Sequence, residues 1–309
     1  MSAHTEKRVL VTGGSGFIGA AVVRYLITHG YTPYLLLRPT TDTSRLLELD
    51  NTYMVLIGDL LDSQAISRIV HELQPTHCIH LAWYAVPGKY HYATENLDFL
   101  KASIDLVQGL MEVNCQRFVG IGTCFEYDTD YGYLSESSPL KPRNLYAATK
   151  ASLFQVLQQV PDFNSVWVRL FYQYGTHESP MRLMPAIMSK MLRGESVDTS
   201  EGHQVRDYLH VDDVASAIVA IMESPLSGAV NVGSGIPMRV TDIIALIEAL
   251  TGKTGLVRRG ALPHNPADPA FICANIERLT SQTTWRPTYS LKTGLEHTIE
   301  WWKTQIEIP

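Results

Sequence analysis

Cysteine, excess basic charge and long apolar runs are all scarce in this chain of 309 residues. Its four cysteines are too few and too scattered for a disulfide scaffold, and no CxxC or Cys/His cluster suggests zinc. Acidic residues outnumber basic ones by 31 to 25, and the pI is about 6.0. This balance argues against a dedicated nucleic-acid binder, although arginines can still form a local pocket for an anionic ligand.

Membrane and export signals are also missing. No apolar stretch reaches the roughly 20 residues that a bilayer-spanning helix needs, and the N-terminus MSAHTEKRVLVTGG lacks the apolar segment of a signal peptide. The 11 histidines show no ligand spacing. We therefore expect a reduced, soluble, cytoplasmic protein without a metal. An apolar content of 45% and a charged content of 18% are ordinary for a globular chain long enough for about two domains.

The first half of the chain alternates apolar runs typical of buried strands with helical segments. The predicted strands cover 8–12, 33–37, 77–82, 117–122 and 165–170, and the predicted helices 17–28, 63–73, 95–113 and 146–160. This βαβ alternation predicts an α/β fold with a doubly wound parallel sheet. After Leu170 the rhythm changes to helices at 181–193, 211–223, 240–250 and 291–303 and a strand at 229–232. We expect a domain over 1–172, to which elements from about 208–235 return, and a smaller α/β lobe over 173–309.

A glycine-rich turn joins the first predicted strand to the first predicted helix. It reads TGGSGFIG, with glycines at 13, 16 and 19. Glycine allows a tight turn and close approach of the backbone to a pyrophosphate, and the helix N-terminus presents free N–H groups to that anion. The sequence therefore predicts a dinucleotide site; a glycine-rich turn without a ligand is the simpler alternative.

The end of the second predicted strand distinguishes NAD from NADP. An acidic residue about 20 positions beyond the glycines is typical of NAD binding, but this chain has Arg38, 19 positions after Gly19. A guanidinium suits a 2′-phosphate, and Arg45 is placed to assist. We favour NADP(H), with NAD(H) as the alternative and a solvated surface arginine as the simplest interpretation. Asp59 follows the third strand and either meets the adenine or caps the next turn.

Tyr146 and Lys150, in YAATK, lie four residues apart and so share one face of a helix. A nearby ammonium favours the phenolate and lowers the pKa of a tyrosine, which makes it a useful acid or base. Thr123 follows a strand and is placed to bond the same substrate oxygen. The alternative is that Tyr146 and Lys150 are an ordinary pair on a helix surface. The preceding βαβ units and glycine loop favour the catalytic interpretation.

The chain resembles the extended short-chain dehydrogenase/reductase family of sugar-nucleotide epimerases, dehydratases and reductases. The matching segments are TGGSGFIG, the HLA at 80–82, GTCFEYD, YAATK, RLFYQYG, RDYLHVDD and NVGSG, which cover about 8–303. The resemblance implies a Rossmann fold, catalysis by Thr123, Tyr146 and Lys150, an NDP-sugar in the C-terminal lobe, and a homodimer through helices 95–113 and 146–160. It implies that the dinucleotide contacts Gly13, Ser15, Gly16, Phe17, Ile18, Gly19, Arg38, Asp59, Leu60, Leu81, Ala82, Tyr146 and Lys150.

Departures from the family pattern narrow the reaction. Dehydratases of this family carry Asp and Glu where this chain has Cys124 and Phe125. The Cys and His of enzymes that epimerise at C3 and C5 align with Phe125 and near Arg182. What remains is hydride chemistry at one carbon. We expect NADPH-dependent reduction of the C4 ketone of a nucleotide-linked 4-keto-6-deoxyhexose. The alternatives are an NAD-dependent 4-epimerase and a non-catalytic dinucleotide sensor, and the intact Thr/Tyr/Lys set argues against the sensor.

Arg206 resembles the family arginine that pairs with the substrate diphosphate, and a bidentate guanidinium–phosphate pair is suited to this role. The alternative is a salt bridge with Asp207 or Asp213. Cys124 is a small buried thiol or a sugar contact, and the lack of a neighbouring base favours the former. The predicted substrate contacts are Tyr84, Thr123, Cys124, Phe125, Tyr172, Arg182 and Arg206.

Overall fold

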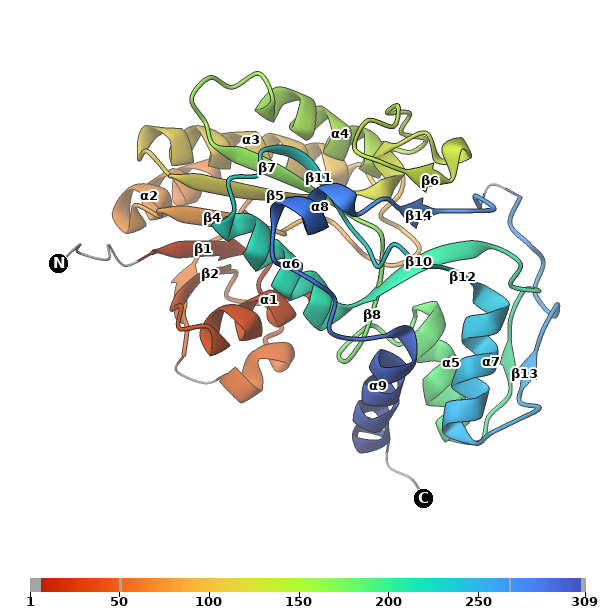
Figure 1. The fold of residues 1–309 in the computed structure, drawn as a ribbon. Coiled ribbons are helices and arrows are strands. Elements are labelled where there is room, and N and C mark those ends of the chain that lie inside the picture. The colour runs from red at the N-terminus through yellow and green to blue at the C-terminus, as the bar shows by residue number, and fades with distance from the viewer. Residues whose placement is uncertain (1–6, 50–51, 267, 307–309) are drawn as a thin grey trace.

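A computed structural model describes residues 7–49, 52–266 and 268–306 of the chain (Figure 1). The strands are Val9–Thr12 (β1), Pro33–Leu37 (β2), Met54–Ile57 (β3), His77–His80 (β4), Arg117–Thr123 (β5), Tyr133–Leu134 (β6), Ser165–Leu170 (β7), Tyr172–Tyr174 (β8), Val197–Asp198 (β9), Val205–His210 (β10), Gly228–Val232 (β11), Pro237–Arg239 (β12), Val257–Arg258 (β13) and Cys273–Ala274 (β14). The α-helices are Phe17–Thr28 (α1), Ser63–Leu73 (α2), Glu95–Glu112 (α3), Leu145–Leu157 (α4), Leu183–Leu192 (α5), Val211–Glu223 (α6), Val240–Thr251 (α7), Glu277–Gln282 (α8) and Leu291–Gln305 (α9). Short 3-10 helices cover Ser44–Leu49 (η1), Cys124–Glu126 (η2) and Thr129–Tyr131 (η3).

The central sheet is parallel throughout. Within the described part of the chain it has seven strands in the order β11-β7-β5-β4-β1-β2-β3. Helices α1 and α6 cover one face, and α2, α3 and α4 cover the other (Figure 1). Both faces are covered, which explains why the inner strands are continuous apolar runs. The predicted doubly wound Rossmann fold is confirmed, and the strand order reverses between β1 and β4, where such sheets bind ligands.

The C-terminal part of the chain builds a second, smaller core. A three-stranded sheet of β12, β10 and β8 lies beside helices α5, α7 and α9, whose apolar faces share a cluster of buried residues. β11 and α6 belong to the larger core around the central sheet: β11 pairs with β7, and α6 packs on α1. Among the described helices, none is both long and apolar enough to cross a membrane.

Most predicted elements lie where the sequence placed them, with shifts at their ends. The helix expected over 181–193 begins at Leu183, because Arg182 is extended (φ −86°, ψ 158°). The helix expected over 146–160 runs from Leu145 to Leu157, and the strand expected over 77–82 ends at His80. The sequence did not predict β8, β10 or β12. These strands are short or mix charged and aromatic residues, so they lack the apolar run of a buried strand.

Candidate active site

The glycine loop between β1 and α1 is tightly closed. Gly13 has a φ of +73°, and a Cβ there would lie 2.7 Å from the Ala82 backbone nitrogen. A Cβ on Gly19 would lie 2.0 Å from the Gly13 carbonyl oxygen, to which the Gly16 N–H donates at 3.0 Å. α1 begins after Gly16 without a side-chain cap or an acidic residue in its first turn. This backbone cradle and the exposed start of a helix fit a dinucleotide pyrophosphate, and Ser15, Phe17 and Ile18 belong to the same turn.

The ends of β2 and β3 hold the residues expected at the adenosine half. Arg38 is exposed, and its N–H donates to the Thr41 hydroxyl at 3.0 Å. The side chain of Arg45 turns elsewhere, since its Nε donates to the His177 carbonyl oxygen at 3.0 Å. Asp59 accepts from the Leu61 N–H at 3.0 Å, which is the turn-capping alternative for this residue.

A buried carboxylate fixes the turn that carries Thr123 at the end of β5. Glu126 is fully buried and accepts from the Thr123 N–H at 2.8 Å, while the Thr123 hydroxyl accepts from the Phe125 N–H at 3.3 Å. Glu126 also accepts from Trp167 Nε1 at 3.0 Å and from Arg169 Nε at 2.7 Å. The sequence analysis missed Glu126, although its spacing from Thr123 matches a capping box.

The Lys150 side chain contacts both β5 and the segment that follows β4. Its ammonium donates to the Ile121 carbonyl oxygen at 2.6 Å and lies 3.7 Å from the centroid of the Trp83 ring. The Trp83 indole donates in turn to Asn96 Oδ1 at 2.8 Å. Burial lowers the pKa of Lys150 to about 7, against the opposing charge of Glu126. Burial thus favours the neutral amine more than in a solvent-exposed lysine.

Tyr146 lies one helical turn before Lys150, with its ring edge-on to Tyr90 at 4.9 Å between centroids. Burial raises the pKa of Tyr146, Tyr90 and Glu126 raise it further, and Arg182 opposes them. The expected lowering of this pKa by Lys150 is thus wrong for this structure. The reason is geometric: the Lys150 ammonium is directed to a carbonyl oxygen and an indole face.

The His80 ring contacts the strand that leads into the glycine loop and the neighbouring helix α3. Its Nδ1 lies 2.7 Å from the Thr12 hydroxyl and its Nε2 lies 2.8 Å from the Ser103 hydroxyl. The Thr12 hydroxyl also accepts from the Ala82 N–H at 3.3 Å. Burial, with a smaller contribution from Lys150, lowers the pKa of His80 to about 3, so the ring is neutral at physiological pH. This side chain positions the turn on which Leu81 and Ala82 meet the glycine loop.

Aromatic rings continue from Phe125 toward the smaller core. The Phe125 ring lies 6.1 Å from that of Tyr172 and 5.8 Å from that of His91. Tyr172 lies 5.4 Å from Tyr208, its register partner on β10. Together with Tyr90, these rings line the side of the site that faces Tyr146. The sequence analysis named Phe125 and Tyr172 but missed His91 and Tyr208.

Two arginines join this aromatic group. The guanidinium carbon of Arg182 lies 5.6 Å from the Tyr90 ring centroid, and that of Arg206 lies 5.3 Å from the Tyr172 ring centroid. Arg206 is buried and donates to Asp268 Oδ1 at 2.6 Å and to the Val205 carbonyl oxygen at 2.8 Å.

The salt bridges considered for Arg206 are replaced by the one with Asp268. Asp207 is occupied by the N–H groups of Ser234, Gly235 and Ala274, and Asp213 by those of Thr288 and Tyr289. No sequence pattern signals the partner that the structure provides, because it lies 62 residues away.

Cys124 fits the description of a small buried thiol. It is 1% exposed, and burial raises the pKa of its thiol to about 12. Tyr84 is half-buried in the segment after β4, beside Trp83. The Cys124 thiol therefore offers no thiolate to the site at neutral pH.

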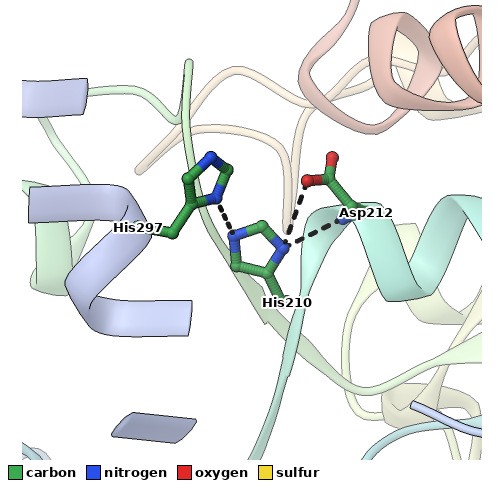
Figure 2. Close-up of side chains that lie close together, drawn as sticks. All are labelled: His210, Asp212 and His297. Carbon is green, nitrogen blue, oxygen red and sulfur yellow. Dashed lines mark hydrogen bonds and ion pairs between the residues drawn. The ribbon is translucent and has the colours of Figure 1, made fainter. Parts of the chain in front are cut away.

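A separate polar cluster joins β10, α6 and α9 (Figure 2). His210 Nδ1 accepts from the Asp212 N–H at 3.3 Å and lies 3.6 Å from the Asp212 carboxylate, whereas Nε2 lies 3.4 Å from His297 Nδ1. Asp212 and His297 thus approach opposite nitrogens of one ring, and both nitrogens of an imidazole cannot bind one ion. We assign this cluster as a hydrogen-bonded connection between elements and not as a metal site.

Comparison with known proteins identifies the family. A model of the NAD-dependent epimerase/dehydratase family matches residues 9–233. The chain belongs to this family. It is therefore an oxidoreductase-type enzyme with an NAD-type dinucleotide site, as the glycine loop predicted.

Relatives of this epimerase/dehydratase span nearly the whole chain. A UDP-glucose 4-epimerase of Halalkalibacterium halodurans is 26% identical over 325 residues, covering 96% of this chain and 95% of the relative. A CDP-abequose synthase of Salmonella muenchen is 23% identical over 303 residues, covering 94% and 96%. The structure of a Thermus thermophilus UDP-glucose 4-epimerase in complex with NAD shares 26% identity at a TM-score of 0.84, covering 97% of this chain and 100% of that one.

Proposed function

We propose that the protein reduces the C4 ketone of a nucleotide-linked 4-keto-6-deoxyhexose with NADPH. The observation that carries this proposal is the pair of side chains following Thr123. The Cys124 thiol is buried with a pKa raised to about 12, and Phe125 has no proton to transfer. Elimination or epimerisation beside the ketone needs an acid/base pair that these two positions do not offer, so hydride transfer at one carbon is the chemistry that remains.

The three catalytic candidates divide the work on the substrate oxygen. A bound nicotinamide would supply the hydride. Tyr146 donates its proton to the oxygen that takes up negative charge, and the Thr123 hydroxyl, whose backbone is fixed by Glu126, orients that oxygen. Lys150, one helical turn after Tyr146, would hold the ribose of the bound nicotinamide.

The preference for NADPH rests on Arg38. Its side chain is exposed at the carboxyl end of β2, next to the glycine loop of β1, where a 2′-phosphate would lie. The Thermus thermophilus relative was solved with NAD. The preference for NADPH is therefore proposed from Arg38 and is not taken from that relative. On the substrate side, Arg206 binds the diphosphate, and an incoming phosphate exchanges with Asp268 for the guanidinium.

We further propose a homodimer through α3 and α4. These helices pack on each other and leave an apolar groove on their outer side, lined in part by Val107, Met111, Val156 and Pro161. Met111 and Val156 are 39% and 45% exposed. Val156→Glu is expected to shift the mass measured by light scattering from dimer to monomer, whereas a monomeric wild type would refute the proposal.

The decisive experiment is turnover of a chemically prepared NDP-4-keto-6-deoxyglucose in D₂O with NADPH. We expect stoichiometric NADPH consumption and a product without deuterium at C3 or C5. Deuterium at either carbon, seen only with enzyme, would show an acid/base pair and overturn the single-carbon mechanism.

An NAD-dependent 4-epimerase is the second candidate, supported by the same Thr/Tyr/Lys set and by the epimerase relatives. An epimerase returns its hydride, so it would keep a tightly bound cofactor through purification and convert UDP-glucose without net NADPH loss. Either result would favour it over the reductase.

A further inference from the structure

The segment between β8 and α5 has an unusual backbone that is fixed from outside. His177 has a φ of +63°, a conformation that non-glycine residues rarely adopt. Its carbonyl oxygen accepts from Arg45 Nε at 3.0 Å, and its ring lies 4.6 Å from the ring of Trp301. These contacts, from both halves of the molecule, determine how the next residue, Glu178, enters the interior.

Glu178 is half-buried, and one oxygen of its carboxyl group has hydrogen-bonding capacity to spare. Among the described residues, its Oε2 is buried without any hydrogen-bond partner. The carboxyl accepts from the Gly175 N–H, and its charged and titratable neighbours are the Arg182 guanidinium on the N-terminal side of α5 and the Tyr208 phenol on β10. Burial raises the pKa of Glu178 to about 8. An unpartnered buried oxygen costs stability, so its retention calls for an explanation.

The neighbours of Glu178 place it at the substrate side of the site. Arg182 lies against the Tyr90 ring, which is edge-on to Tyr146. Tyr208 lies beside Tyr172, the ring over which Arg206 packs. Glu178 therefore interacts with residues on two sides of the site, Arg182 beside Tyr90 and Tyr208 beside Tyr172.

We propose that Glu178 is a specificity-determining residue whose free carboxyl oxygen bonds a hydroxyl group of the substrate's sugar. This inference rests on the nucleotide-sugar function proposed above. A sugar hydroxyl both donates and accepts, so it pairs with the carboxyl whether or not that group is ionised. A phosphate oxygen would be repelled by the ionised form, so the diphosphate is not the partner. A site built to bond a hydroxyl rejects ligands that lack it, because the polar group is then left unpaired.

The test compares ligands with and without the sugar. Calorimetry measures the Kd of UDP, dTDP, CDP and GDP and of their glucose conjugates for wild type, Glu178→Leu and Glu178→Gln, with NADP⁺ present throughout. We expect Glu178→Leu to weaken binding of the NDP-glucose that wild type binds by about 10- to 100-fold, because a sugar hydroxyl is then left without its hydrogen-bond partner. The matching NDP should be unaffected, and Glu178→Gln should recover part of the loss.

Two controls make the outcomes distinguishable. Glu195→Gln, on an exposed glutamate paired with Arg193, should bind like wild type. Equal weakening of NDP and NDP-glucose by the Glu178 variants, or no weakening, would overturn the role of Glu178 alone. Failure of wild type to bind any of the eight ligands would instead overturn the proposed nucleotide-sugar function, and this inference with it.

The pH dependence gives a readout should Glu178→Leu fail to fold. An ionised carboxylate bonds a hydroxyl more strongly than the neutral acid does. The ratio of the Kd of NDP-glucose to the Kd of the matching NDP is therefore expected to fall between pH 6.5 and 9 in wild type and to change less in Glu178→Gln. Burial raises the pKa of Tyr208, so the phenol that faces Glu178 keeps its proton across this interval. Identical profiles in the two proteins would refute the assignment.

Discussion

Glu126→Gln is expected to be among the most destabilising conservative changes in this protein. The side chain keeps its shape but loses the charge that faces Arg169, whose guanidinium is 1% exposed and has an Nη2 without a partner among the described residues. Breaking a buried ion pair from one side typically costs about 3–5 kcal/mol, since the remaining charge stays buried and uncompensated. We expect a loss of that size in the free energy of unfolding.

The hydrogen bonds of Glu126 support the same magnitude. Oε1 accepts from the Thr123 N–H and Trp167 Nε1, and Oε2 accepts from Trp167 Nε1 and Arg169 Nε. In glutamine, one oxygen becomes an NH₂ group, which must oppose either the Thr123 N–H or the Arg169 Nε–H. Each buried donor left unsatisfied costs about 1–3 kcal/mol, more for a charged one.

Equilibrium unfolding in urea, followed by tryptophan fluorescence, measures the loss. Glu195→Gln is the matched surface control and should change stability by less than about 0.5 kcal/mol. The double variant Glu126→Gln/Arg169→Met removes both charges and keeps an amide oxygen for the Thr123 N–H and Trp167 Nε1. It should recover most of the loss, because no uncompensated charge then stays buried. A cost below about 1 kcal/mol for Glu126→Gln, or a double variant less stable than the single one, would refute this reasoning.

Three further predictions concern chemistry, cofactor and pH. Tyr146→Phe should keep the fold and lower kcat by about 10²–10⁴, as for loss of a positioned acid, and near-normal single-turnover hydride transfer would remove Tyr146 from the mechanism. Arg38→Asp should invert the ratio of kcat/KM from NADPH toward NADH; a wild type that already prefers NADH would contradict the role of Arg38. The pKa of His80 is about 3 in the folded protein, which is below its value in the unfolded chain. As the pH falls, the unfolded chain therefore binds this proton first, and the free energy of unfolding decreases from about pH 6.5 toward pH 3. His80→Gln, compared with wild type in urea at pH 7 and pH 5, should flatten that slope by up to about 1.4 kcal/mol per pH unit; parallel slopes would contradict the assignment.

The sequence alone predicted the features that depend on residues close together in the chain. The alternation of apolar strands and helices predicted the sheet, and glycine spacing predicted a loop that closes on Gly13 at φ +73°. YAATK places Tyr146 and Lys150 on one helix face because four residues make about one turn. Each of these features is encoded within a few neighbouring residues.

The sequence did not predict side-chain contacts between different helices, strands and loops, because no local pattern encodes them. Lys150 finds Trp83 and the Ile121 carbonyl only when α4, the segment after β4, and β5 come together. The same holds for Arg206 with Asp268, and for His210 with His297. The predicted influence of Lys150 on the pKa of Tyr146 failed for this reason: helical spacing sets which face a side chain leaves from, and tertiary contacts set where its charged end lies.

The raised pKa of Tyr146 bears on the direction of the reaction. Reduction of a ketone needs a donor that holds its proton until negative charge develops on the oxygen. The half-buried phenol of Tyr146, with its raised pKa, is protonated at neutral pH. Oxidation of an alcohol, the first half of a 4-epimerase cycle, needs the phenolate, which burial disfavours. The Lys150 ammonium is directed to the Ile121 carbonyl oxygen and the Trp83 ring, so it does not offset this effect. A protonated Tyr146 is thus consistent with the reduction proposed above.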